Sequence, residues 1–232
     1  MSDSEQAAGG PAQEGDEQAR ASFERTRDPS RVLRLSDGVF AIIMTLLVLD
    51  IRVPRLSEGT SLAAAVRELR PSLTAFVISF ILAGMYWVRH RDLFGLIRLT
   101  NRGLVWLNLV FLLALCLLPL GTELLGRYNR QSAALQIYGV IVFATEVMQV
   151  AIWLYVTSHP HLLWRRLGHR QRWAGLALTV IPALIFLLAV LISATAPGVS
   201  LAIYGLMPVG YFIGVTVLRG TQRRNKEYED FT

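Results

Sequence analysis

The sequence has little charge and almost no cysteine, and each shortage excludes a class of protein. Only 17% of the 232 residues are charged and 53% are hydrophobic, which is too little charge for an ordinary soluble domain of this size. Cys116 is the single cysteine, which excludes an intrachain disulfide and a thiolate metal cluster. The sequence also has no glycine-rich phosphate loop, nucleophile elbow or HExxH motif. It therefore gives no indication of a catalytic site or of an organic cofactor.

The chain has long hydrophobic runs instead. Its mean hydropathy is +0.43, and six segments reach the length of about 20 residues that a helix needs to cross a bilayer. These segments are residues 33–52, 71–91, 103–124, 133–157, 173–195 and 199–218. Pro119, Pro182 and Pro208 lie inside spans, where neighbouring helices tolerate a kink. We therefore predict an all-α integral membrane protein with six transmembrane helices.

The distribution of basic residues predicts the orientation. Placing both termini in the cytoplasm puts 17 of the 23 Lys and Arg residues on the inner side and 6 in the outer loops, as the positive-inside rule requires. Residues 1–30 are polar and lack apolar periodicity, so we expect a disordered cytoplasmic N-terminus and no signal peptide. The transmembrane domain is then 31–219, and 220–232 is a cytoplasmic tail. Because the basic residues flank spans, the pI of about 10.0 does not indicate nucleic-acid binding.

The first span carries a charge on one face and large aliphatic side chains on another. Asp37 lies within a membrane-length helix, where a charged group must face protein or water. At 100° per residue, Ile42, Leu46 and Leu49 fall within about 60° of one another, and Asp37 points about 140° away from Ile42. Thr45 lies about 60° from Ile42 on the same wheel. The pattern favours a pore-lining helix over an anchor, although most aliphatic stripes of this kind are packing faces.

Polar residues gather at the inner ends of the first three spans. Ser36 and Asp37 begin the first span, and Trp87 and His90 end the second on one helix face. Asn108 lies near the start of the third, close to Asn101 and Trp106. Groups this polar at membrane depth need partners, so we expect an interhelical clamp. The alternative is that the histidine is solvated at the interface and that the tryptophan belongs to the aromatic belt.

The first half of the chain also contains an ordered series of motifs. They are Arg31, Leu35-Ser36-Asp37-Gly38-Val39-Phe40-Ala41-Ile42, Thr45-Leu46-Leu47-Val48-Leu49, Trp87-x-x-His90, Phe94, and Leu104-x-Trp106-Leu107-Asn108-Leu109 with Pro119. Together they resemble the signature of the transmembrane protein 175 family of potassium channels. The resemblance covers about residues 31–125, with Leu35 in place of the family's aromatic residue before Ser-Asp. The second half matches the family only in hydropathy and number of spans.

The resemblance implies a potassium-permeable channel in a bacterial cytoplasmic membrane. A single copy of the motif is similar to the bacterial form, which assembles as a homotetramer with the first helix around the pore. Ile42, Leu46 and Leu49 would then form the constriction, with Thr45 as a possible pore hydroxyl. The supporting network would consist of Arg31, Ser36, Asp37, Trp87, His90 and Asn108. Potassium ions and membrane lipids are the expected partners, with no cofactor and no metal beyond the permeating potassium.

Three further positions are open to interpretation. Asp50 ends the first span and could attract cations to an outer vestibule, although nearby arginines oppose that effect. Glu146 lies mid-span and is either a hydrogen-bonded packing residue or part of a proton path. His159, His161 and His169 have no carboxylate or thiol at metal-site spacing, so we expect them to be solvated.

Two other functions fit the same residues. A proton-coupled transporter or proton leak pathway would use Asp37, His90 and Glu146 as a relay, because such proteins keep ionisable groups within the membrane. A structural scaffold would have no conductance at all. Passive dissipation of a potassium gradient favours the channel, uptake driven by a pH gradient favours the transporter, and tight liposomes favour the scaffold.

Overall fold

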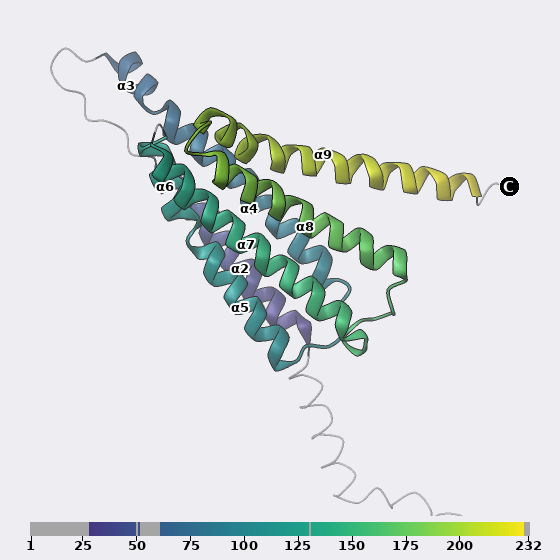
Figure 1. Ribbon diagram of the computed structural model, residues 1–232. Coiled ribbons are helices and arrows are strands. Elements are labelled where there is room, and N and C mark those ends of the chain that lie inside the picture. The colour runs from purple at the N-terminus through teal and green to yellow at the C-terminus, as the bar shows by residue number, and fades with distance from the viewer. Residues whose placement is uncertain (1–27, 50, 52–60, 130, 230–232) are drawn as a thin grey trace, which may run out of the picture.

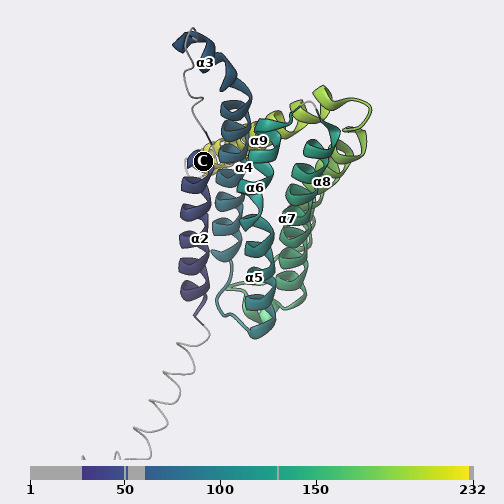
Figure 2. The same ribbon diagram turned by 90° about the vertical axis from the view of Figure 1, so that its left-hand side faces the viewer.

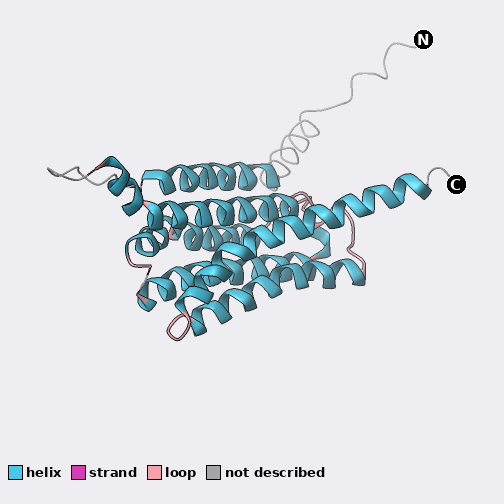
Figure 3. Ribbon diagram, turned by 90° about the horizontal axis from the view of Figure 1, so that it is seen from above, coloured by secondary structure: helices cyan, strands magenta, loops and turns pink. Residues whose placement is uncertain are grey.

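The computed structural model describes residues 28–49, 51, 61–129 and 131–229, and the protein is helical throughout this part of the chain (Figures 1 and 3). The elements are α2 Pro29–Leu49, α3 Leu62–Glu68, α4 Arg70–Phe94, α5 Arg102–Cys116, α6 Leu118–Arg127, α7 Ser132–Ser158, η1 Pro160–Leu162, α8 His169–Ile192 and α9 Pro197–Glu229. The predicted all-α class is therefore confirmed.

Five segments of the described chain are long and apolar enough to cross a membrane, namely α2, α4, α5 together with α6, α7 and α8. Each overlaps a predicted span. The predicted sixth span, residues 199–218, lies in α9. The structure describes the helical backbone of this segment but not the side chains of residues 212 and 215–218. A sixth span therefore stays a prediction, as do the boundaries of the two terminal segments.

The third span is divided near its middle. α5 ends at Cys116 and α6 begins at Leu118, with Pro119 in its first turn. Proline has no N–H and its ring clashes with the carbonyl four residues earlier, so it is tolerated at the start of a helix and not inside one. The peptide N–H of Leu117 bonds instead to the carbonyl oxygen of Ala114 at 3.2 Å, which closes the last turn of α5.

Two connections pair at one end of the bundle. Ile97 and Leu163 form an isolated antiparallel bridge, and the peptide N–H of Arg98 donates to the carbonyl of Leu162 at 2.7 Å. This end also carries the starts of α2, α5 and α8 (Figure 1). We call it the arginine-rich end because it holds Arg31, Arg34, Arg91, Arg98, Arg102, Arg165, Arg166, Arg170 and Arg172. The pairing places the second and fourth inter-span connections on the same side, as the predicted topology requires.

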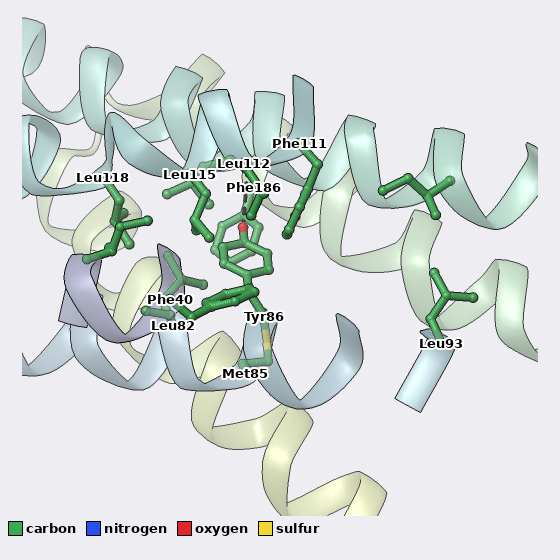
Figure 4. Packing of buried hydrophobic residues seen from close by; sticks show 14 of the residues in the cluster. Phe40, Leu82, Met85, Tyr86, Leu93, Phe111, Leu112, Leu115, Leu118 and Phe186 are labelled. Atoms are coloured by element: carbon green, nitrogen blue, oxygen red, sulfur yellow. Dashed lines mark hydrogen bonds between the residues drawn. The ribbon is translucent and has the colours of Figure 1, made fainter. Parts of the chain in front are cut away.

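The core joins helices from both halves of the chain. Phe40 of α2, Tyr86 of α4, Phe111 of α5 and Phe186 of α8 are all buried, and Figure 4 shows these side chains converging. α2 contacts α4, α5 and α6 and lies at one edge of the bundle, on the side away from α7 and α8 (Figure 2). One face of α2 is therefore committed to its own subunit and the rest is left uncovered.

Candidate ion pathway and its supporting network

The predicted pore residues lie on the uncovered face of α2. Ile42 is 59% exposed, Leu46 42% and Leu49 71%, and Gly38 has open space where a side chain would extend. Thr45 is also exposed, and its hydroxyl donates to the carbonyl of Ile42 at 2.8 Å. The aliphatic stripe is therefore not a packing face within the subunit. It is available to a neighbouring chain, to lipid or to a pore.

The opposite face of α2 fixes the rotation of the helix. Ser36, Phe40, Ile43 and Leu47 are buried, and they recur at the three- and four-residue spacing of a single helix face. Because lipid tails are as apolar as these side chains, the stabilisation comes from close packing between the helices and not from removal of water. Rotation of α2 about its axis would expose these residues, so the direction of the uncovered stripe is set by the core behind it.

Hydrogen bonds reinforce this arrangement between α2, α4 and α5. The indole N–H of Trp87 donates to Asp37 Oδ1 at 2.9 Å. Asn108 Nδ2 donates to Ser36 Oγ at 3.0 Å, and that hydroxyl in turn donates to the carbonyl of Val32 at 2.9 Å. The structure thus brings together residues from the starts of the first and third spans and the end of the second. The carboxylate of Asp37, exposed to the membrane in an isolated helix, has a charge-assisted partner here.

His90 occupies an aromatic pocket behind the same contacts. Its Nε2 lies 2.8 Å from Asn108 Oδ1, and because the amide nitrogen of Asn108 donates to Ser36, the amide oxygen accepts and Nε2 carries the proton. The imidazole stacks on Phe94, with ring centroids 4.3 Å apart, and on Phe111, at 5.5 Å. The ring is only 1% exposed, so His90 is a buried member of the network and not a solvated interfacial residue.

Arg31 is the member of the predicted network that does not join these contacts within the described part of the chain. Its side chain is exposed. Asp50 lies outside the described residues. The guanidinium that does approach the network belongs to Arg91, which lies over the Trp87 ring at 5.2 Å from its centroid. A cation over an indole face is favourable, and sequence reasoning missed this contact.

A buried ion pair lies deeper in the bundle. Arg89 Nη1 donates to both carboxylate oxygens of Glu146, at 2.8 and 3.0 Å, with side chains 5% and 0% exposed. The guanidinium also lies over the Tyr211 ring at 5.3 Å. Arg89 is buried and its side chain points into the bundle from α4, unlike the exposed arginines of the arginine-rich end. A mid-span carboxylate needs a countercharge, but the sequence gives no signal that identifies Arg89, rather than Arg91, as its partner.

The three ionisable groups of the suggested proton relay have separate partners. Asp37 bonds to Trp87, His90 to Asn108, and Glu146 to Arg89. Among the described residues, no hydrogen bond joins the three groups to one another. Each of the three groups therefore has a local structural partner.

The histidines of the second inner connection are also locally satisfied. His159 stacks on Tyr155, with ring centroids 4.3 Å apart, and His169 Nε2 accepts the indole N–H of Trp173 at 2.9 Å. His161 is exposed. Among the residues that the structure describes, no group of three or more His, Cys, Asp or Glu side chains is placed to hold a metal ion.

Comparisons with known proteins agree with the motifs at this site. Residues 31–119 match the family described as the endosomal/lysosomal potassium channel TMEM175. A protein of Streptomyces collinus that is named a potassium channel is 31% identical over 188 residues, which are 79% of this chain and 91% of that protein. A Gallus gallus protein named endosomal/lysosomal proton channel TMEM175 is 34% identical over 166 residues, which are 64% of this chain and 33% of that protein.

The fold agrees as well. A crystal structure described as a lysosomal potassium-selective channel TMEM175 homolog from Chamaesiphon minutus superposes with a TM-score of 0.72 at 26% identity, covering 80% of this chain and 96% of that one. This structural similarity agrees with the match to the Streptomyces protein, 91% of whose length is covered. The two findings together show the family. The chain is a multi-pass membrane protein that belongs to the TMEM175 family of potassium channels.

Proposed function

We propose that the chain forms a homotetrameric, potassium-permeable channel in which α2 of each subunit lines a central pore. Family membership supports potassium conduction, because the Streptomyces relative is named a potassium channel. The observation that carries the pore assignment is the exposure of Ile42, Leu46 and Leu49 on a helix whose opposite face is held by the core and by hydrogen bonds.

The three aliphatic residues would form the constriction. Rings of isoleucine or leucine offer no oxygen ligands, so a passing ion must keep its water or lose part of it. Potassium is larger and more weakly hydrated than sodium and loses water at lower cost, so a modest preference for potassium follows. Thr45 places a hydroxyl oxygen on the same exposed face and would add a polar layer to the pore.

Assembly would cover the rest of the exposed α2 surface. Leu35 and Val48 are also about half exposed; Leu35 extends the stripe by nearly two turns toward the start of α2, and Val48 lies about 120° from Ile42. An apolar face this wide fits contact with a neighbouring subunit as well as with a pore axis. In this arrangement the bonds from Asp37 to Trp87 and from Ser36 to Asn108 hold the stripe toward the axis.

The orientation places the arginine-rich end in the cytoplasm, following the positive-inside rule. Both termini are then cytoplasmic, and the bacterial relative supports the bacterial cytoplasmic membrane as the location. Arg31 would lie at the inner entrance of the pore, and Asp50 would follow the constriction at the outer vestibule. Both charges would act on ions through the field at the two mouths.

Reversal potentials test the proposal. The purified protein in planar bilayers, under a potassium/sodium gradient at equal pH on both sides, should give a passive current that reverses toward the potassium equilibrium potential. A pH gradient imposed with equal potassium and sodium on both sides should leave the reversal potential near zero. A silent bilayer would support a scaffold and contradict the proposal.

Proton conduction is the second candidate function. The observation that favours it is that the Gallus gallus relative is named a proton channel. Against it, Asp37, His90 and Glu146 each bind a different partner, and within the described residues no direct hydrogen bond joins them to one another. In the same bilayers, a current whose reversal potential follows only the proton gradient would establish this function in place of potassium conduction.

A further inference from the structure

A groove between α7 and α8 lies at the arginine-rich end and takes no part in the network around α2. It has a volume of about 350 Å³ and is lined mainly by apolar and aromatic groups, among them Trp153, Leu154, Trp173 and Leu176. The indole of Trp153 packs closely against α8, because a Cβ at Gly175 would overlap its ring. The groove is therefore built into the contact between the two helices.

Arg172 is the charged side chain in the described lining of the groove whose hydrogen-bonding capacity is mostly unused. The two indole N–H groups are already used, because Trp153 donates to the carbonyl of Arg172 at 3.3 Å and Trp173 donates to His169 at 2.9 Å. Arg172 Nη2 donates to the carbonyl of Thr157 at 3.0 Å, which fixes its guanidinium at the end of α7. Most of the five N–H donors of the guanidinium have no other partner within the described part of the chain.

The stretch of chain that ends α7 and begins α8 carries charge of one sign. Residues 147–226 contain no aspartate or glutamate, and Arg165, Arg166 and Arg170 are exposed close to Arg172 in the chain. An arginine-rich segment beside an apolar groove complements a molecule with an anionic head and an apolar tail. A zwitterionic headgroup would bring an ammonium group into the same cationic field and would be disfavoured.

The position of the groove points to lipid and not to a neighbouring subunit. α7 and α8 lie on the side of the bundle away from α2 (Figure 2), and α2 packs against α4, α5 and α6. If α2 faces the pore axis, the groove faces the bilayer. Tryptophan and arginine side chains at a helix end are typical of the membrane interface, where lipid headgroups lie.

We propose that this groove is a binding site for an anionic phospholipid. The guanidinium of Arg172 binds the phosphate of the headgroup, and one acyl chain lies along Trp173, Leu154 and Leu176. The charge of Arg172, which is the arginine in the groove lining, selects a net negative headgroup over a zwitterionic one, and the neighbouring arginines add a smaller contribution to the same field. The exposure of the groove to lipid rests on the proposed arrangement with α2 at the pore axis, but lipid binding at the groove does not require that the pore conduct ions.

Tryptophan quenching tests the site in the full-length protein. Bilayers of phosphatidylcholine would contain either brominated phosphatidylglycerol or brominated phosphatidylcholine, and the Trp173 signal would be the difference between wild type and Trp173→Phe. Brominated phosphatidylglycerol should reach half-maximal quenching at an about fivefold lower mole fraction, the factor expected for one arginine near an anionic headgroup. Equal quenching by the two lipids in wild type would overturn the proposal.

Substitutions and changes in salt concentration, measured in the same quenching assay, distinguish an effect of charge on lipid preference from an effect of altered folding. Arg172→Gln should remove the preference, whereas Arg166→Gln, which changes an exposed arginine outside the groove lining, should keep most of it. Arg172→Lys retains the charge and should retain the preference; a loss equal to that of Arg172→Gln would contradict a site that selects by charge. Raising the salt concentration should weaken the wild-type preference without any substitution, because salt screens exposed charges. A salt-independent preference would also count against the proposal.

Discussion

Replacing Leu46 by alanine should abolish most of the preference for potassium over sodium and increase the single-channel conductance. The substitution removes an isobutyl group from each subunit at the proposed constriction and lets ions pass with more of their water. If the wild-type permeability ratio is about tenfold, its loss corresponds to about 1.4 kcal/mol of discrimination between the two ions. The measurement is the reversal potential under a potassium/sodium gradient, with Ile42→Ala recorded beside it.

A neighbouring leucine provides the matched control. Leu47 is fully buried against the rest of the subunit, whereas Leu46 is 42% exposed. Leu47→Ala should therefore cost stability, about 2–5 kcal/mol for a buried leucine, and leave selectivity unchanged in channels that assemble. Unchanged selectivity and conductance in well-assembled Leu46→Ala channels would show that the stripe is not the constriction.

Replacing Glu146 by leucine should destabilise the protein by about 3–5 kcal/mol, because it leaves the guanidinium of Arg89 buried without its countercharge. The pair is nearly inaccessible to solvent, and one guanidinium nitrogen, Arg89 Nη1, donates to both carboxylate oxygens of Glu146. Water therefore does not readily replace the lost partner. Thermal unfolding of the purified protein in detergent measures the effect. Arg89→Met alone should cost a similar amount, because it leaves the carboxylate unpaired.

The double variant Arg89→Met with Glu146→Leu distinguishes the interaction energy of the ion pair from the separate effects of the two substitutions on stability. Replacing both ions of a buried pair with apolar groups of similar size is often close to neutral, so the double variant should recover much of the stability lost in either single variant. Simple addition of the two losses would contradict a direct pairing. A Glu146→Leu protein that keeps wild-type stability and loses a proton current would favour the relay.

The first helix was well predicted from sequence because its two faces differ in composition. The apolar stripe at Ile42, Leu46 and Leu49 and the polar Ser36 and Asp37 occupy different sectors of the helical wheel, and three-dimensional packing keeps this division. Hydropathy also located the second to fifth spans to within a few residues, since bilayer thickness sets their length. Local periodicity is sufficient for features of this kind.

Contacts between distant segments were less predictable. Arg89 and Glu146 are separated by 57 residues, and nothing in the local pattern distinguishes Arg89, which points into the bundle, from Arg91, which lies over Trp87. Helix rotation decides which arginine is buried, and that depends on how α4 packs against α7. The short α3 helix, which begins after the N-cap Ser61, also escaped prediction because it is too short for a clear periodic signal.

Thiol modification of α2 tests the central claim most directly, namely that its exposed stripe faces a conducting pore. In a Cys116→Ser background, which removes the exposed native cysteine, Leu46→Cys would be compared with Val48→Cys. The two positions are similarly exposed in the subunit, at 42% and 49%, but they point about 160° apart on the helix. A charged methanethiosulfonate reagent should block the potassium current of the Leu46→Cys channel and leave that of the Val48→Cys channel largely intact. Block of both channels to the same extent, or of neither, would contradict a pore lined by this stripe.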